Sequence, residues 1–262
     1  MNELARAKVN LSLHVVGKRA DGFHLLDSIV VFPEIGDVLR LQGHGLSLSG
    51  PFAAGLAGHD NLVMRAAEMV GYAGGFHLQK NLPVASGVGG GSADAAAALR
   101  LLAKAGLPGM GALGADVPAC LLSKPLRMRG IGEQLELLPR LPDFAIVLVN
   151  AGQPVPTPQV FKALKKVDNP GSQTMPEGLS QRDFFAFIKA QRNDLQAAAI
   201  KICPKIETVL TVLGAGDDCA LARMSGSGGT CFGLFESLAK ARRAAREIRR
   251  QNPGWWVAAA PV

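Results

Sequence analysis

The sequence predicts an α+β fold, and three observations support this prediction. Strand-like and helix-like stretches are mixed along the 262 residues, without the strict alternation that a doubly wound parallel sheet requires. Glycine clusters separate these stretches, and one cluster leads directly into an alanine-rich helix. No segment is repeated, and the length allows one large domain or two modest ones.

The first half predicts strands with two helices among them. Residues 8–32 alternate apolar and polar side chains on both sides of a break at 19–22 (RADG), which indicates a strand, a turn and a second strand. A helix is expected where apolar residues recur at helical spacing after Asp60 or Asn61, either of which could cap it. The other expected elements are strands over 37–43, 45–50 and 75–83, and helices over 61–72 and from Ala93 to about Ala105.

The first half ends with an apolar strand at 143–150, and a stretch rich in proline and glycine follows at 151–158. Such stretches are typical of domain boundaries, so we expect one domain over 1–151 and another over 152–262. The final strand, near 254–260, could return to the sheet of the first domain. The other expected elements are helices over 158–167, 184–199, 205–215 and 238–250, with a loose polar segment over 168–177.

Composition limits the function classes. Apolar residues make up 48% and charged residues 19%, which is ordinary for a globular protein, and the net charge of +7 suits a protein that handles anions. Part of this charge lies in a C-terminal helix, 240–250 (KARRAAREIRR). Its basic face is either solvated or an RNA-binding surface, but it lacks the interleaved aromatic side chains that stack on bases.

The four cysteines are scattered without a CxxC pair or zinc-site spacing, which favours reduced thiols. The N-terminus shows no leader pattern, and the apolar runs are too short to span a bilayer. We therefore expect a cytoplasmic protein without a membrane partner.

The first glycine loop (residues 83–91, PVASGVGGG) predicts a phosphate site. Gly87, Gly89, Gly90 and Gly91 lack Cβ atoms, so consecutive N–H groups can approach a ligand closely. Ser92 could cap the helix that follows, and the N-terminus of a helix attracts anions. The alternative is a flexible turn. The position of the four glycines between a strand and a helix favours the phosphate site over this alternative.

Two other glycine-loop classes are excluded. A Walker A loop needs Gly-Lys-Ser or Gly-Lys-Thr, which the chain lacks, and a Rossmann fingerprint would need a third glycine at Ser92. The second glycine loop (residues 224–229, MSGSGG) is either a hairpin turn or a loop that closes on the same ligand from the other domain.

Phosphoryl transfer needs a group that takes the proton of the acceptor, and Asp116 is the best candidate. It lies in a loop between Gly114 and Pro118, although an aspartate there could merely cap a helix. Lys8 could pair with Asp116 and orient the acceptor, or it could be a solvated residue at a strand edge. Asn10 would point to the same side of that strand as Lys8.

Phe23 and His24 together could hold a nucleobase. Phe23 supplies an aromatic face, and His24 supplies an edge that donates and accepts hydrogen bonds. The alternative is a packed hairpin corner. From the residues alone, the expectation is a phosphate-binding protein, and an enzyme more readily than a binding module.

Several motifs, in order and over nearly the whole chain, resemble the GHMP kinases. The first glycine loop with Ser92 and Ala93 resembles the phosphate loop of that superfamily. The stretches 5–30, 114–120 (GADVPAC), 129–133, 155–161 (VPTPQVF), 192–199 and 224–235 resemble more closely the members that act on a cytidine diphosphate-linked methylerythritol. This resemblance implies a GHMP kinase fold, with an N-terminal α+β nucleotide-binding domain and a ferredoxin-like C-terminal domain.

The resemblance also implies an activity and its residues. The activity is ATP-dependent phosphorylation, with Mg²⁺, of the 2-hydroxyl of the methylerythritol in the non-mevalonate isoprenoid pathway. Asp116 is the implied base, Lys8 positions it, and Asn10, Phe23, His24 and Thr157 contact the substrate. Phe23 stands where the family usually has tyrosine, and the stretch from Asp94 to Asp116 is shorter than in the family. The implied ATP-binding residues are Pro83, Val84, Ala85, Ser86, Gly87, Val88, Gly89, Gly90, Gly91, Ser92 and Ala93.

Two other functions remain open at this point. Another small-molecule GHMP kinase would share the first glycine loop but would not depend on cytidine. An RNA-binding protein would use the basic C-terminal helix, would bind in a salt-dependent way and would not need Asp116. It would also leave the first glycine loop and the GADVP segment without a role.

Overall fold

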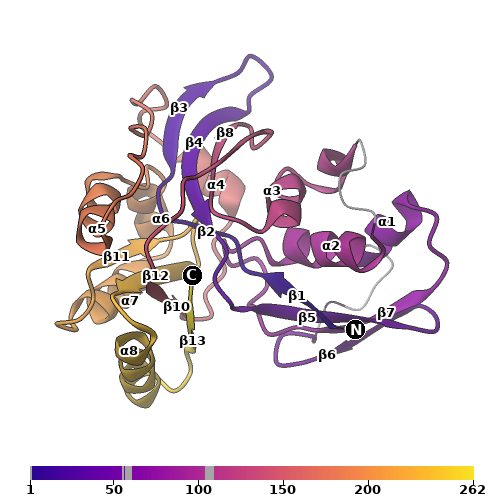
Figure 1. The fold of residues 1–262 in the computed structure, drawn as a ribbon. Helices are drawn as coiled ribbons and strands as arrows, with labels where there is room; N and C mark the ends of the chain where they lie inside the picture. The colour runs from indigo at the N-terminus through magenta and orange to yellow at the C-terminus, as the bar shows by residue number, and fades with distance from the viewer. Residues whose placement is uncertain (1, 55, 57–60, 104–108) are drawn as a thin grey trace.

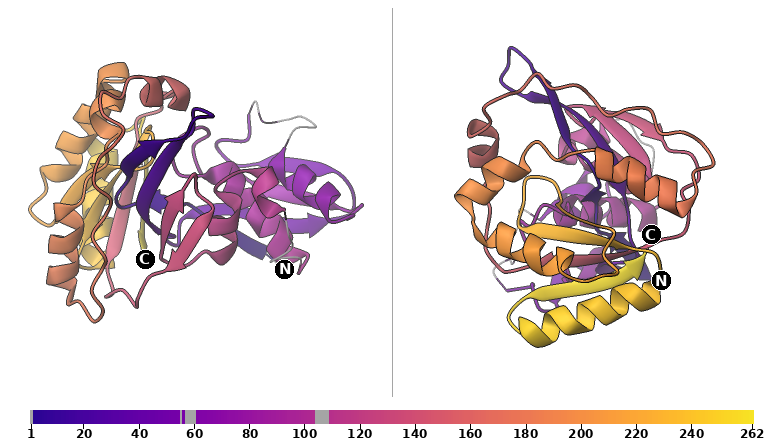
Figure 2. Two further views of the ribbon diagram at one scale, coloured as in Figure 1. Left: turned by 90° about the horizontal axis from the view of Figure 1, so that it is seen from above. Right: turned by 90° about the vertical axis from the view of Figure 1, so that its left-hand side faces the viewer.

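The computed structural model describes residues 2–54, 56, 61–103 and 109–262, and it confirms the mixed helix and strand architecture. In this part of the chain, the strands form three sheets, and helices cover the two outer ones (Figure 1). The central sheet lies between the outer two, so the molecule is elongated when seen from above (Figure 2, left).

The first sheet belongs entirely to the first half of the chain. Its strands run in the order β1-β5-β7-β6, and α2 packs on β1 and β5. The alanines of α2 are fully or nearly fully buried, because small side chains let the helix approach the sheet closely. The elements are β1 (Asn2–Arg6), β5 (Gly36–Gln42), β6 (Leu46–Ser49), β7 (Gly75–Gln79), α1 (Leu62–Met69) and α2 (Gly90–Leu101).

The central sheet contains the predicted strand, turn and strand. Lys18 pairs with His24 and Val9 with Val31, so the chain folds back around the turn at 19–22 as expected. A register shift between Val15 and Gly17 interrupts the hairpin. The elements are β2 (Val9–Asn10), β3 (His14–Lys18), β4 (His24–Val31), β8 (Leu126–Gly130) and β9 (Gln134–Leu137), with α3 (Val117–Leu122) and a 3₁₀ turn (Met110–Leu113) before β8.

The third sheet pairs strands from both sides of the expected domain boundary. β10 lies within the predicted first domain, but it pairs with β12 and β13 in a sheet otherwise made by the second half of the chain. β10 is buried along its whole length, so it suits the centre of a sheet. β13 pairs with β10 and does not join the first sheet. The elements are β10 (Ala145–Asn150), β11 (Leu221–Met224), β12 (Thr230–Phe235) and β13 (Trp256–Pro261).

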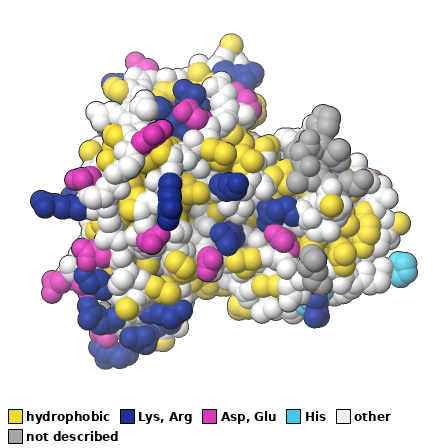
Figure 3. Space-filling model, viewed as in Figure 1, with side chains coloured by type: hydrophobic (Ala, Val, Ile, Leu, Met, Phe, Trp, Pro, Cys, Tyr) yellow, Lys and Arg dark blue, Asp and Glu magenta, His cyan; other side chains and the backbone are white. Residues whose placement is uncertain are grey.

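The helices of the second half lie around this third sheet (Figure 2, right). In α8, Ala241, Ala245 and Ile248 face the core, and the basic residues face outward, as the spacing predicted. Figure 3 shows these basic side chains gathered where Figure 1 places α8. The elements are α4 (Thr157–Lys162), α5 (Gln181–Ala190), α6 (Gln196–Ile202), α7 (Lys205–Gly214) and α8 (Leu238–Gln251).

The helix ends test several of the predicted caps and helix boundaries. Asn61 caps α1 by accepting from the N–H of Val63, whereas Asp60 lies outside the described residues. α2 begins at Gly90, earlier than expected, so Gly89 occupies the N-cap and Ser92 lies inside the helix. α2 ends at Leu101, and the expected end near Ala105 also lies outside the described residues. The helices expected over 184–199 are α5 and α6, and residues 191–195 separate them.

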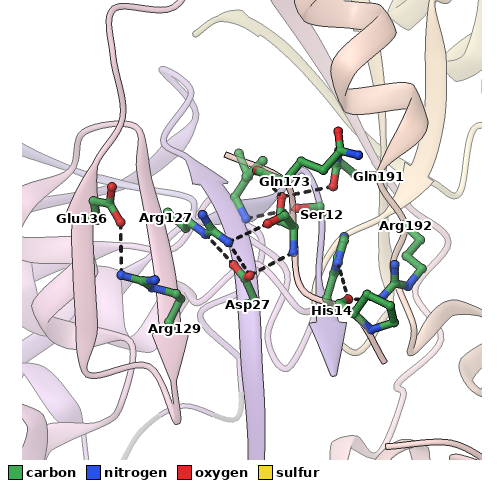
Figure 4. A network of polar contacts seen from close by, with 12 residues as sticks. Ser12, His14, Asp27, Arg127, Arg129, Glu136, Gln173, Gln191 and Arg192 are labelled. Atoms are coloured by element: carbon green, nitrogen blue, oxygen red, sulfur yellow. Dashed lines mark hydrogen bonds and ion pairs between the residues drawn. The ribbon is translucent and has the colours of Figure 1, made fainter. Parts of the chain in front are cut away.

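A polar network joins the central sheet to the second half of the chain (Figure 4). Arg127 donates two hydrogen bonds to Asp27, of 2.8 and 2.6 Å, and a third of 2.7 Å to the carbonyl of Ser172. The N–H of Ser172 donates back to Asp27 at 2.9 Å. Burial is the largest influence on Asp27 and disfavours its charge. The hydrogen bonds and charge of Arg127, together with the N–H of Ser172, outweigh it and lower the pKa of the carboxyl. The network holds segment 170–173 on β4 and β8.

All four cysteines are unpaired. No helix in the described part of the chain is both long and apolar enough to cross a membrane.

Candidate active site

The first glycine loop brings the backbone against the predicted reaction centre. Gly87 and Gly89 have φ values of 78° and 64°, a region that favours glycine. A Cβ on Gly89 would lie 3.3 Å from the Cβ of Lys8 and 3.7 Å from Oδ2 of Asp116. The last residues of the loop, Gly90 and Gly91, form the first turn of α2, whose N–H groups have no partner within the helix. The loop therefore presents main-chain donors close to both side chains.

Lys8 and Asp116 form an ion pair, although 108 residues separate them. Nζ of Lys8 donates to Oδ1 of Asp116 at 2.6 Å. The N–H of Lys8 donates to the carbonyl of Val88 at 2.9 Å, which ties the link between β1 and β2 to the first glycine loop. Asp116 occupies the N-cap position of α3, but its side chain makes no cap hydrogen bond to that helix. Lys8 is 7% exposed and Asp116 31%, so the carboxylate is the accessible partner.

The second glycine loop closes on the first. It is a hairpin turn between β11 and β12, as one alternative predicted, and it also packs on the first loop. Its closure on the same ligand stays a prediction. Oγ of Ser225 donates to the carbonyl of Gly87 at 3.1 Å. A Cβ on Gly87 would lie 2.5 Å from the carbonyl oxygen of Gly228, which leaves room only for glycine there. Asn193 anchors the second loop by donating to the carbonyls of Met224 and Gly226.

Asn10 lies between these two features. Its side-chain amide donates to Oγ of Ser28 at 2.8 Å, and its main-chain N–H donates to Oγ of Ser225 at 3.1 Å. It is 1% exposed and does not line the cavity described next. In this structure, Asn10 joins β2 to the second glycine loop, and its contact with an acceptor stays a prediction.

A cavity of about 810 Å³ extends from Asp116 to the hairpin corner. It brings together residues that the sequence predicted separately, from the central sheet, the helix after the first glycine loop, α4 and the loop before α3. Thr157 reaches it from α4, and its hydroxyl lies 2.6 Å from that of Ser227 in the second glycine loop. The predicted residues that line it are Phe23, His24, Ser92, Asp116 and Thr157.

Phe161 is a cavity residue that the sequence reasoning missed. Its ring stacks on that of His24, with centroids 4.9 Å apart and planes inclined by 26°. Burial, and then the charge of Lys18, lower the pKa of His24, so its ring favours the neutral form. The helical spacing of Thr157 and Phe161 was a signal that could have found Phe161, because residues four apart share one face of a helix. Phe23 extends this aromatic wall and is 60% exposed.

A buried charge cluster under the first glycine loop was also missed. Lys80 donates to Asp37 and, at 2.7 Å, to Oδ2 of Asp94, and all three side chains are at most 5% exposed. Oδ1 of Asp37 accepts from the N–H groups of Asn81 and Leu82, which lead into the loop. Burial raises the pKa of Asp94 to about 8, and its Oδ1 has no partner among the described residues. The cluster holds the strand before the loop against the helix after it.

Comparisons with known proteins identify the family of this chain. Residues 61–124 match the family model "GHMP kinases N terminal domain", and residues 177–254 match "GHMP kinases C terminal". A 4-diphosphocytidyl-2-C-methyl-D-erythritol kinase of Paracoccus denitrificans is 54% identical over 261 residues, covering 98% of this chain and 95% of that one. The enzyme of the same name from Dinoroseobacter shibae is 51% identical over 97% of this chain and 92% of its own.

Solved structures extend the comparison to the fold. A crystal structure of 4-(cytidine 5'-diphospho)-2C-methyl-D-erythritol kinase matches with a TM-score of 0.77 and 32% identity, covering 100% of this chain and 98% of the other. A mevalonate kinase from L. major, with R-mevalonate, matches with a TM-score of 0.69, 99% and 95% coverage and 15% identity, so it shows only the shared fold. The chain therefore belongs to the GHMP kinase family, and within it to the 4-diphosphocytidyl-2-C-methyl-D-erythritol kinases.

Proposed function

We propose that this kinase transfers the γ-phosphoryl group of ATP to the 2-hydroxyl of 4-diphosphocytidyl-2-C-methyl-D-erythritol, in the non-mevalonate isoprenoid pathway. The observation that carries the proposal is the Lys8–Asp116 pair, which lies where the first glycine loop meets the cavity. The relatives named for this reaction match nearly the whole chain, so the proposal does not depend on one shared domain.

In the proposed mechanism, Asp116 accepts the proton of the 2-hydroxyl as the alkoxide oxygen bonds to the γ-phosphorus and ADP leaves. Lys8 bonds Oδ1 of Asp116, and no hydrogen bond between described residues occupies Oδ2. The pair therefore leaves one carboxylate oxygen directed to the substrate. Because such transfers pass through a loose transition state, holding the two reactants in line contributes much of the acceleration.

The first glycine loop and the start of α2 fit the phosphates of ATP. Gly87 and Gly89 adopt conformations that suit glycine, and the first-turn N–H groups of α2 are free to donate to an anion. We assign ATP binding to residues 83–93 on this basis. The second glycine loop holds the first in place through Ser225, which favours a site already formed before ATP binds.

Mg²⁺ would accompany ATP. The described residues contain no group of three or more His, Cys, Asp or Glu side chains that could hold a metal ion. Mg²⁺ in kinase sites needs few protein ligands, because phosphate oxygens supply much of its coordination. The hydroxyl of Ser92, on the helix after the loop, lines the cavity and is a suitable oxygen donor. When bound, Mg²⁺ neutralises charge on the transferred phosphoryl group.

The aromatic end of the cavity would hold the cytosine. Phe23 and Phe161 offer ring faces, and His24 offers a hydrogen-bonding edge. Thr157 would contact the middle of the substrate, and Asn10 would act at the acceptor through the loop that it anchors. We also propose that the protein works in the cytoplasm, which the four unpaired cysteines support, and without a nucleic acid or membrane partner.

The test is ATP consumption with Mg²⁺ and 4-diphosphocytidyl-2-C-methyl-D-erythritol, for the intact protein, Asp116→Asn and Asp168→Asn. Asp168 is exposed and does not line the cavity, so it controls for the same chemical change elsewhere. We expect kcat to fall by about 10²- to 10⁴-fold in Asp116→Asn alone, with ATP binding kept. Turnover preserved in Asp116→Asn would remove it as the base. If the intact protein binds ATP but shows no turnover, the proposed acceptor substrate is wrong.

A further inference from the structure

We propose that Lys18 and Lys162 bind the diphosphate of the substrate and so select a nucleotide-linked acceptor over a plain nucleoside. The inference rests on the proposed function and names two specificity residues for it. Both lysines line the cavity that contains Asp116, Phe23 and His24, although neither lies in a motif that marks a phosphate site.

The two lysines flank the aromatic pair. Lys18 in β3 pairs in register with His24 in β4, and Lys162 directly follows Phe161 at the end of α4. The rings of His24 and Phe161 stack with centroids 4.9 Å apart. Each ring therefore has a lysine beside it, one across the hairpin and one along the helix.

The charges in the cavity are not balanced. Asp116 is the single carboxylate among the lining residues, and it already bonds Lys8. Within 2–54, 56, 61–103 and 109–262, the structure gives neither Lys18 nor Lys162 an ion pair or a side-chain hydrogen bond. The wall thus carries two uncompensated positive charges, and a diphosphate supplies negative charge of comparable size.

The positive charge of Lys18 acts on His24, and both residues line the cavity. Burial is the larger cause of the lowered pKa of His24, and the positive charge of Lys18 is the second. A charge that disfavours protonation of the ring is close enough to attract an anion bound beside it.

The chemistry of a nucleoside diphosphate matches this placement. A single ribose separates the base from the first phosphate, so a base on the aromatic wall places its phosphates beside that wall. This site differs from the one proposed for ATP, where main-chain N–H groups of the first glycine loop bind phosphate. Flexible ammonium groups suit a diphosphate that must enter and leave through the cavity mouth, and both lysines are exposed.

The test is calorimetric titration of the full chain with cytidine, CMP and CDP, in the presence of a saturating non-hydrolysable ATP analogue that fills the ATP site. The variants are Lys18→Gln and Lys162→Gln, with Lys124→Gln as a matched control, because Lys124 is exposed and does not line the cavity. We expect each cavity variant to bind CDP about five- to tenfold more weakly and to keep its affinity for cytidine. We also expect added salt to reduce the affinity for CDP less in the variants than in the intact protein.

Three results would overturn the proposal. The cavity variants could lose affinity for cytidine and CDP equally, or Lys124→Gln could lose as much affinity for CDP as they do. The third such result is an intact protein that binds cytidine as tightly as CDP. The variants Lys18→Arg and Lys162→Arg should keep the preference, since they keep the charge. Turnover of the full substrate is a separate measurement. A protein that prefers CDP through these lysines but does not phosphorylate the substrate would contradict the proposed function and support this inference.

Discussion

Two lysines of this protein form short ion pairs with aspartates on either side of the first glycine loop, yet their surroundings differ. Lys8 pairs with Asp116, which is 31% exposed and lines the cavity. Lys80 pairs with Asp37 and Asp94, and these two carboxylates are 0% and 5% exposed. The same chemistry therefore serves two purposes. An ion pair open to a cavity can meet a substrate, whereas a closed one can only hold the chain together.

The difference follows from what each lysine joins. Lys8 approaches a loop that ends in Asp116, and Gly89 leaves the pair accessible because it has no side chain. Lys80 lies between β5, the end of β7 and α2, where the first glycine loop begins and ends. Water can solvate Asp116 when its partner is removed, but it cannot reach Asp37 or Asp94 without opening the fold.

Removing the buried cation should have the largest effect. Lys80→Met leaves Asp37 and Asp94 in the core without their cation, so we expect a loss of about 3–5 kcal/mol in the free energy of unfolding. Urea unfolding followed by circular dichroism measures this. Lys124→Met is the control, and we expect it to change stability by less than about 0.5 kcal/mol. A Lys80→Met protein as stable as the control would show that the cluster does not support the loop.

Removing Lys8 should separate activity from stability. In Lys8→Met, Asp116 keeps contact with solvent, so we expect a stability loss of only about 1 kcal/mol. We expect kcat to fall by about 10²-fold, because the carboxylate is no longer oriented toward the acceptor. Steady-state kinetics and urea unfolding of the same preparation check both expectations. If Lys8→Met unfolds as readily as Lys80→Met, exposure does not distinguish the two pairs.

The raised pKa of Asp94 should make the stability of the protein depend on pH. Burial raises its pKa from 3.8 to about 8, so the folded protein retains a proton that the unfolded chain releases. This contribution to stability is present below pH 4 and is lost as pH rises through 8. Asp94→Asn does not titrate, so its stability relative to the intact protein should rise from pH 5 to pH 8. Urea midpoints across that range measure the difference, and a constant difference would mean that Asp94 is ionised throughout.

The smallest expected effect concerns the hydroxyl pair that joins α4 to the second glycine loop. Thr157→Val removes a hydrogen bond of 2.6 Å to Ser227 and one donor in the cavity. We expect the KM for the cytidine-linked substrate to rise by about threefold with kcat unchanged. The exposed Thr174→Val is the control. A fall in kcat at unchanged KM would instead place Thr157 at the reaction step, beside Lys8 and Asp116.

Much of the local structure could be predicted from the sequence. The hairpin over 8–32, the cap at Asn61, the amphipathic α8 and the loop before α2 depend on neighbouring residues, and each was found near its predicted place. The start of α2 was missed by three residues, because glycines weaken a helix in isolation and Gly90 and Gly91 join it only where packing supports them. Motif order over the whole chain also identified the family correctly.

The site itself depended on long-range contacts. The pairing of Lys8 with Asp116 spans 108 residues, and the packing of the second glycine loop on the first spans 138 between Ser225 and Gly87. Phe161 became part of the aromatic wall only because α4 lies against the hairpin. The cluster around Lys80 shows no local pattern, since its three members come from β5, the residue after β7 and α2.

The sequence by itself therefore determined which backbone conformations are available, where glycine frees the main chain, and which chemical groups the protein can use. Local sterics and hydrogen bonding decide these matters within a few residues. Only the tertiary structure decided which groups meet, which are solvated, and that β10 pairs with the second half of the chain. Those outcomes depend on the burial of apolar surface between distant segments, whose free energy no single segment contains.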